Sequence, residues 1–305
     1  MPIDRNRGTR QDLVFVAVIL LPLIILVGIL IYFPAIDSLI TSFTNENLRI
    51  RRLPKFIGLK NYSKLIENSE FWIVTARSLL VVSLTLPLEL LISLSLALLL
   101  TEAFPGRAMV RTLILLPWML PPIVNGFLWG WLLNGEYGAL NGLLYQMGII
   151  DEYVTWLRNP DTQVIWVVVV QTWTRFAFPT IILLAGLQSI PKDLLDAAKV
   201  DGASSWQSFK NIVLPLLMPS FAVASTIEFI ASFQIFDVIW TLAAGGSAGG
   251  AINPFTKTLM LYNYELVFRD LRIGLGAALS YLILFLSLGV AIVFVTRLYN
   301  QAVKS

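Results

Sequence analysis

Polar and aromatic side chains interrupt a long apolar run in the middle of the chain, VVVVQTWTRFAFP (residues 167–179). Polar groups inside an apolar helix are costly, so they are candidates for function. Gln171 offers amide donors and acceptors, which suit hydroxyl groups. Arg175 suits an anion, because its planar guanidinium binds bidentately. The alternative, which we favour, is an intramembrane ion pair of Arg175 with Glu228 or Glu89.

Other kinds of chemistry are excluded by composition. The chain has no Cys and no His, so thiolate nucleophiles, disulfides, imidazole bases and Cys/His zinc sites are absent. It also lacks the phosphate-binding GxxxxGK[ST] loop, so we expect neither ATP hydrolysis by this chain alone nor a cofactor of its own. Its carboxylates form no convincing catalytic group, and we do not expect an enzyme. The net charge of +3 is spread out and favours no nucleic acid partner.

The elements that carry these residues are long apolar helices. Of 305 residues, 57% are hydrophobic and 13% are charged, against about 25% charged residues in soluble domains. About twenty apolar residues in a helix cross the hydrocarbon core of a bilayer. The sequence therefore predicts an all-α membrane protein with six transmembrane helices. The predicted spans are residues 13–35, 73–100, 108–133, 164–187, 216–242 and 274–295.

A cleaved signal peptide is the alternative for the first span. Its apolar core would be about 7–15 residues long and would end at small residues. Here the apolar run is longer and continues into Tyr32-Phe33-Pro34, so we expect an uncleaved helix. Residues 1–12 then form an N-terminal tail, and residues 13–305 form a single transmembrane domain.

The orientation rests on charge. An even number of spans puts both termini on one side, and residues 134–163 carry one Arg against four carboxylates, which indicates an external loop. We therefore expect cytoplasmic termini. Residues 36–72 then form a second external loop, whose basic residues contradict a simple positive-inside count. They are Arg49, Arg51, Arg52, Lys55, Lys60 and Lys64.

A polar segment, residues 190–215, separates the fourth and fifth spans. Its charges keep it out of the bilayer core. Pro191 suits the first turn of a short helix, and Gly202 suits its end. Ser204 or Ser205 suits the cap of a second helix. An amphipathic connector at the lipid interface would also fit this composition.

The spacing within this segment is more specific. Asp196-Ala197-Ala198 is followed after three residues by Gly202 and after nine more by Ile212-x-Leu214-Pro215. This pattern resembles the EAA loop of importer-type ABC transporter permeases, with Asp in place of the usual Glu. The coupling residues that the resemblance implies are Asp196, Ala197, Ala198, Asp201, Gly202, Leu214 and Pro215.

The resemblance extends along most of the chain. FIGLKNYSKLIENSEFW (residues 56–72), RTLILLPWMLPP (residues 111–122) and FDVIWTLAAGG (residues 236–246) are similar to segments of the carbohydrate permeases of the maltose-type family. Two departures stand out: Gly245-Gly246-Ser247 replaces the usual Gly-Gly-Pro, and Arg77-Ser78 replaces a common Asn-Thr. Both could alter contacts with an external partner.

The family resemblance implies a type I ABC importer permease fold with a cytoplasmic coupling helix, in a bacterial inner membrane. It implies a second homologous permease subunit, two ATPase subunits that hold ATP and Mg, an extracytoplasmic substrate-binding protein, and a sugar or sugar derivative as substrate. The substrate residues that it implies are Trp118, Gln171, Thr174, Arg175, Phe178, Phe233 and Gln234.

Several alternatives remain open at this stage. Trp118 could contact substrate or serve packing. A proton-coupled secondary transporter or a membrane scaffold could also have this composition, and the main substrate site could lie in the partner subunit. The carboxylates available for proton coupling are Glu89, Glu228 and Asp237. The aromatic residues that we assign to packing or to the membrane interface are Trp129, Trp131, Trp166 and Trp240.

Overall fold

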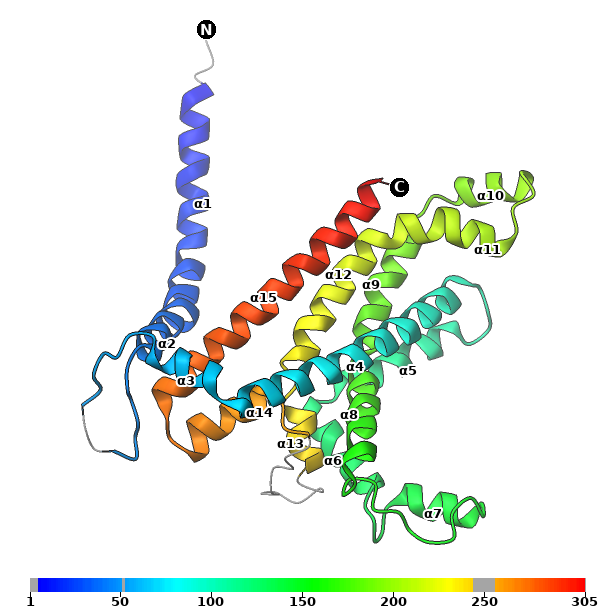
Figure 1. The fold of residues 1–305 in the computed structure, drawn as a ribbon. Helices are drawn as coiled ribbons and strands as arrows, with labels where there is room; N and C mark the ends of the chain where they lie inside the picture. Colours follow the sequence, from blue (N-terminus) through cyan, green and yellow to red (C-terminus); the bar gives the residue numbers. More distant parts are fainter. Residues whose placement is uncertain (1–4, 51–52, 244–255, 305) are drawn as a thin grey trace. The chain divides into compact units, whose positions relative to one another are not determined.

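A computed structural model describes residues 5–50, 53–243 and 256–304 (Figure 1). These residues form helices and a single isolated β-bridge between Thr44 and Phe56, which confirms the predicted all-α class. The chain divides into two compact units. The first comprises Met1–Asn68 and Asn263–Leu282, and the second comprises Ser69–Tyr262 and Ile283–Ser305.

The first unit begins with one long helical stretch. Its helices are α1 (Arg5–Val27), the π-helix η1 (Gly28–Tyr32), α2 (Phe33–Ser42), α3 (Lys60–Glu67) and the π-helix η3 (Glu265–Arg269). The apolar helix of the first predicted span continues beyond residue 35 to Ser42. In η1 the N–H of Phe33 binds the carbonyl of Gly28. This wider turn precedes Pro34, which has no N–H to donate, and the helix continues past it.

The chain after α2 folds back on itself within the first unit. The Asn61 side-chain amide donates to the carbonyls of Ser42 and Thr44, at 2.9 and 2.7 Å. Gly274 approaches the same turn so closely that a Cβ there would lie 2.3 Å from the Thr44 carbonyl oxygen. Residues 36–72, predicted as a loop, thus contain the end of α2 and all of α3.

Part of the unexpected basic charge of this segment is paired. Arg49 donates to the Arg269 carbonyl at 2.6 Å and lies 3.5 Å from the Asp270 carboxylate. The pairing leaves the count of Lys and Arg residues in this segment unchanged.

The second unit is a bundle around α4. Its helices are α4 (Ser69–Thr101), α5 (Arg107–Met119), α6 (Pro122–Leu132), α7 (Ala139–Gln146), α8 (Pro160–Arg175), α9 (Ala177–Gln188), α10 (Lys192–Val200), α11 (Ser205–Ser208), the π-helix η2 (Phe209–Val213), α12 (Leu214–Phe233) and α13 (Asp237–Ala243). Two further helices, α14 (Leu259–Tyr264) and α15 (Ile273–Lys304), contribute residues to both units. Helix α4 packs against α8, α9 and α12, and α9 packs against α12 (Figure 1).

Three predicted spans are broken. The third bends by 94° between α5 and α6, and the fourth bends by 49° between α8 and α9. In the described residues four helices could each cross a membrane, or up to six spans if each bent pair counts as one. The predicted fifth span, residues 216–242, is wrong as a single helix, because α12 ends at Phe233 and α13 begins at Asp237.

Buried polar side chains satisfy the backbone at these breaks. Pro121 and Pro122 lack N–H groups, so carbonyls of α5 lose their helical partners. The Asn125 amide donates to the Pro117 carbonyl at 2.9 Å and to the Leu120 carbonyl at 3.4 Å. Such internal partners are required where no water is available.

A side-chain hydrogen bond also ties the break between α8 and α9 to the central helix α4. The hydroxyl of Ser93 on α4 donates to the Phe176 carbonyl at 2.8 Å. Phe176 is the residue between the two helices. This hydrogen bond fixes the bend against α4.

The contact of α6 with α13 depends on one glycine. A Cβ at Gly126 would lie 1.7 Å from Thr241 Oγ1 and 2.9 Å from Thr241 Cβ. Gly126→Ala should therefore lower the free energy of unfolding of the purified protein by about 1–3 kcal/mol through overpacking. Thermal unfolding in detergent measures this change.

Gly289 provides the matched control. It lies within α15, and a Cβ there meets no atom within 4 Å. Gly289→Ala should leave the unfolding temperature unchanged or raise it, because Ala favours helices. Equal effects of the two substitutions would contradict the close contact at Gly126.

Candidate functional site

The polar segment between α9 and α12 consists of two short helical parts joined by a hinge at Gly202. We call residues 191–213 the α10–α11 segment. Gly202 has a φ of +80°, a conformation that favours glycine. The Gly202 N–H binds the Lys199 carbonyl at 3.1 Å, and the Ala203 N–H binds the Ala198 carbonyl at 2.9 Å. This pair of bonds is a Schellman motif, so the predicted end of the helix at Gly202 is confirmed.

The second half of the segment starts at a capping box. Ser204 accepts from the Gln207 N–H, and the Gln207 side chain accepts from the Ser204 N–H. This result selects Ser204 over Ser205 as the cap. From Ser205 the helix continues through η2 and α12 to Phe233, so motion of the segment acts directly on a long helix. Pro191 is the residue before α10, not in its first turn as predicted.

The residues that the sequence analysis predicted for coupling differ in exposure. Asp196, Ala197 and Gly202 are exposed, whereas Ala198 is buried against its own chain. Two apolar residues that the sequence analysis did not select, Val200 and Trp206, are 87% and 69% exposed. Trp206 also stacks on Phe209, with ring centroids 5.7 Å apart.

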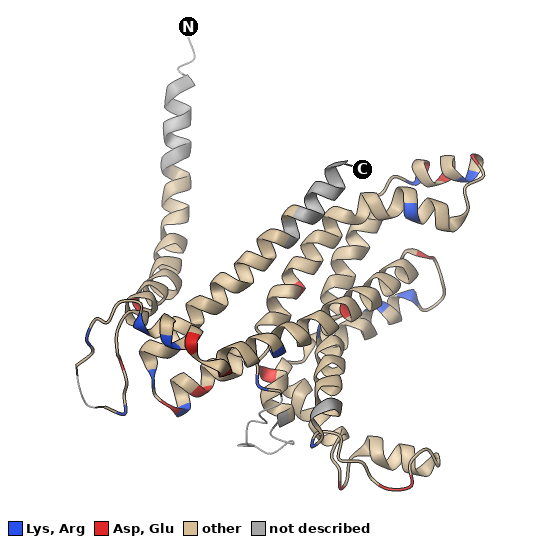
Figure 2. Cartoon of the chain, in the orientation of Figure 1, with Lys and Arg blue, Asp and Glu red and all other residues tan. Residues whose placement is uncertain are grey.

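Charges gather on the same segment, whereas α9 carries none (Figure 2). The Lys199 ammonium donates to Asp196 at 2.9 Å. This hydrogen bond and the attraction of the carboxylate raise the pKa of Lys199. Because both side chains are exposed, the pair adds little to stability.

A small polar cavity of about 90 Å³ lies where α8 meets the chain between α12 and α13. It brings together four of the predicted substrate residues: Gln171, Thr174, Arg175 and Gln234. The sequence analysis weighed Asp237 only as a proton carrier, but Asp237 also lines this cavity. The other residues that line it are Pro122, Ala231, Ile235, Phe236 and Val238.

The three aromatic candidates are not among the lining residues of this cavity. Phe233 is 1% exposed and stacks on Phe229, with ring centroids 5.8 Å apart. Trp118 and Phe178 contact each other, also at 5.8 Å. Phe233 therefore has a packing environment, while Trp118 is 44% exposed and could still meet another molecule.

Arg175 forms a bidentate ion pair with Glu228. Its Nε lies 2.7 Å from Oε2 of Glu228, and its Nη2 lies 3.2 Å from Oε1. Glu228 is fully buried, and the Arg175 side chain is 23% exposed. The pair that the sequence analysis favoured is confirmed, and its partner is Glu228 rather than Glu89.

Glu89 lies close enough to Arg175 and Glu228 to interact with both electrostatically. It is fully buried, and neither carboxyl oxygen has a hydrogen-bond partner among the described residues. Buried hydroxyls lie one helical turn away on the same helices: Thr85 on α4 and Ser232 on α12. A polar cluster thus crosses the α4–α8–α12 interface.

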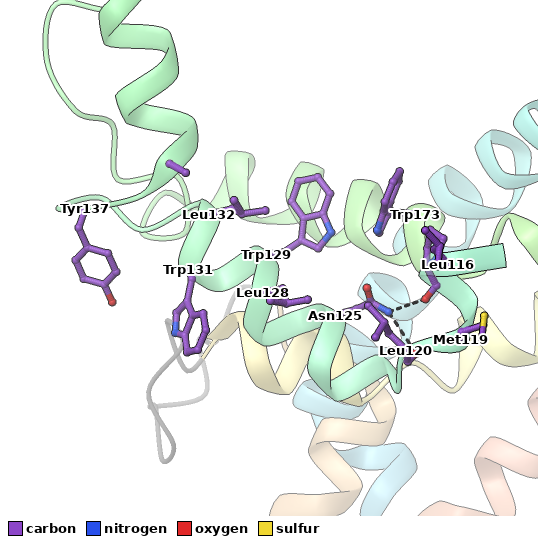
Figure 3. Close-up of a pocket in the computed structure, with 12 residues that line it drawn as sticks. Leu116, Met119, Leu120, Asn125, Leu128, Trp129, Trp131, Leu132, Tyr137 and Trp173 are labelled. Carbon is purple, nitrogen blue, oxygen red and sulfur yellow. Dashed lines mark hydrogen bonds between the residues drawn. The ribbon is translucent and has the colours of Figure 1, made fainter. Parts of the chain in front are cut away.

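A much larger groove, of about 1060 Å³, lies beside the broken α5–α6 pair (Figure 3). Its walls are mainly apolar, and Asn125 is its main polar group. The predicted substrate residues are not among its lining residues. Its lining residues are Leu116, Pro117, Met119, Leu120, Asn125, Leu128, Trp129, Trp131, Leu132, Tyr137, Ala139 and Trp173.

Several aromatic side chains pack against one apolar core cluster of the second unit. The rings of Trp129 and Trp166 are 6.0 Å apart, and Trp166 also meets Trp156 at 5.9 Å. Trp240 stacks on Phe236 at 5.8 Å. These contacts agree with the packing predicted for Trp129, Trp166 and Trp240.

One of the two departures from the family pattern has a structural role. The Ser78 hydroxyl accepts from the Leu259 N–H at 2.9 Å and so anchors α14 to α4. The other departure, Gly245-Gly246-Ser247, lies outside the described residues.

Residues 89–305 match the family described as binding-protein-dependent transport system inner membrane component. The chain belongs to this family. It is a multi-pass membrane permease subunit of a transporter. The matched region contains the α10–α11 segment, the polar cavity and the Arg175–Glu228 pair.

Two curated relatives agree in length and sequence. The chain is 35% identical over 275 residues to the trehalose/maltose transport system permease protein MalF of Thermococcus litoralis, covering 90% of each chain. It is 30% identical to the trehalose transport system permease protein SugA of Mycobacterium tuberculosis, covering 88% of this chain and 83% of the relative.

The fold is also found in a solved transporter. A crystal structure of a bacterial alginate ABC transporter, in complex with an alginate pentasaccharide-bound periplasmic protein, contains a chain that matches with a TM-score of 0.77. The match covers 94% of both chains at 22% identity, and it confirms the type I importer permease fold.

Proposed function

We propose that this chain is the permease subunit of an ATP-driven ABC importer for a sugar or sugar derivative. The α10–α11 segment carries this proposal, because its Schellman hinge has the spacing of the EAA loop and continues directly into a candidate span. The names of the trehalose and maltose relatives support the substrate class. Family membership favours this function over the proton-coupled alternative.

In this proposal the α10–α11 segment docks on a separate ATPase subunit that binds ATP and Mg. Ala197, Val200 and Trp206 supply an exposed, mainly apolar contact surface. Ala198 acts differently: it is buried, so its small size lets α10 pack against its own chain. The docking face and both termini are then cytoplasmic.

The polar cavity is the proposed substrate contact of this subunit. Gln171, Thr174 and Gln234 line it, and their amides and hydroxyl can bind sugar hydroxyls. Its small volume shows that this conformation holds space for part of a sugar ring only. The exposed Trp118, in the same proposal, stacks on a ring face when the path opens.

The larger apolar groove supports a second homologous permease subunit as a partner. Trp131 is 54% exposed on this surface. Its helix, α6, contains no charged residue. Aromatic residues are enriched at subunit interfaces. An extracytoplasmic binding protein completes the proposed assembly and delivers the sugar at the opposite membrane face.

Reconstitution tests the function. Proteoliposomes with this chain, its partner permease, the ATPase and the binding protein should accumulate labelled sugar only when ATP is inside with the ATPase. Omission of the ATPase should abolish uptake, and a protonophore should have no effect. Uptake by this chain alone, abolished by the protonophore, would instead support the proton-coupled alternative.

A substitution at Gly202 tests the proposed coupling role of the α10–α11 segment. Ala at a φ of +80° costs roughly 1–2 kcal/mol, so Gly202→Ala should distort the hinge. We expect weaker ATPase co-purification and at least a severalfold loss of transport-linked ATP hydrolysis.

Gly148 is the matched control, because it ends α7 with a φ of +67° and the same two hydrogen bonds. Neither glycine has another atom within 4 Å of a built Cβ. Gly148→Ala should leave ATPase co-purification intact. Equal loss in both variants would show that backbone strain, and not the coupling role, causes the defect.

A further inference from the structure

The charges around the polar cavity indicate the charge class of the substrate. We infer that this subunit selects neutral sugars and rejects sugar acids, with the Arg175–Glu228 pair as the determinant of that selectivity. The inference rests on the proposed sugar-import function and adds the charge class of the substrate. An exposed arginine in a sugar path would by itself suggest the opposite class, because guanidinium binds carboxylates well.

The geometry weakens Arg175 as an anion receptor. Two of its five N–H groups already meet both carboxyl oxygens of Glu228, at 2.7 and 3.2 Å. Glu228 is fully buried and cannot turn to water without breaking the pair. A sugar carboxylate would therefore compete with a preformed, bidentate carboxylate.

With Glu228 ionised, as its bidentate bonding to Arg175 favours, the charges at the cavity do not sum to a positive value. Arg175 contributes one positive charge and Glu228 cancels it. Glu89 beside the pair and Asp237 in the cavity lining can add only negative charge or none. The result holds for either protonation state of Glu89, so an incoming anion meets a neutral or negative site.

Arg175 is the one Lys or Arg residue among those that line the cavity. Lys257 is paired with Glu70 at 2.5 Å. Arg77 lies on α4 three turns before Glu89, or roughly 18 Å along the helix axis. Neither residue is among those that line the cavity.

The pair still serves binding of a neutral sugar. Arg175 keeps three N–H groups after pairing, and its side chain is 23% exposed and lines the cavity. With Gln171 and Gln234 it offers donors without net charge. Hydroxyl groups of a neutral ring suit such a site.

Direct binding to the assembled transporter tests this inference without the selectivity of the binding protein. The complete permease–ATPase complex in lipid nanodiscs is titrated with trehalose, maltose and sucrose. It is then titrated with the same sugars after oxidation of one CH₂OH to a carboxylate. The wild-type complex should bind the neutral probes at least about tenfold more tightly.

Two substitutions should shift the ratio of the affinity for neutral sugars to the affinity for sugar acids in opposite directions. Glu228→Gln frees the Arg175 charge and should lower the neutral-to-acid ratio at least about fivefold. Arg175→Gln leaves Glu228 uncompensated and should raise it. Glu70→Gln is the matched control, because it neutralises one carboxylate of an ion pair outside the cavity and should not change the ratio.

Equal or tighter binding of the acids by the wild-type complex would overturn the inference. An unchanged ratio in both Glu228→Gln and Arg175→Gln would also overturn it. Uptake of sugar acids by the reconstituted importer would leave the sugar-import function standing while refuting the charge selectivity. Uptake of neither class by a complex that hydrolyses ATP would refute the sugar-import function itself.

Discussion

Polar groups placed within apolar spans must find their partners inside the protein, and this constraint organises the second unit. Arg175 is held by Glu228, which lies on a different helix, so the charge ties α8 to α12. The same constraint applies to the backbone: Asn125 donates to the Pro117 carbonyl at the α5–α6 break, and Ser93 adds a hydrogen bond to the Phe176 carbonyl at the α8–α9 break. Because the backbone carbonyls at these breaks have hydrogen-bond partners, irregular backbone and polar side chains can lie within the bundle without destabilising it.

The α10–α11 segment is stabilised differently, since it is polar and exposed. Its shape comes from local hydrogen bonds, with Gly202 closing one helix and Ser204 opening the next. Such a segment can keep its shape while it moves as a unit. Its continuity with α12 extends from Ser205 to Phe233, and Glu228 lies near the far end of that helix. One continuous helix therefore connects the second half of the α10–α11 segment to Glu228 of the ion pair.

Local signals in the sequence predicted much of this structure. The spacing around Gly202 predicted the hinge. The break after Phe233 was missed, because FQIFDVIW reads as one apolar run. The sequence could not place Asp237 at the cavity, orient Ala198 inward or choose Glu228 over Glu89 for Arg175. Each of these depends on how separate helices pack, which helical periodicity alone does not specify.

Substrate protection of single cysteines tests most directly that the polar cavity lies on the transport path. The chain has no native cysteine, so each introduced thiol is read without background. Gln234→Cys lies at the polar cavity, and Leu128→Cys lies in the apolar groove. In the reconstituted importer, saturating sugar should slow modification by a cationic thiol reagent at residue 234 and leave it unchanged at residue 128. Protection at residue 128 without protection at residue 234 would contradict the account.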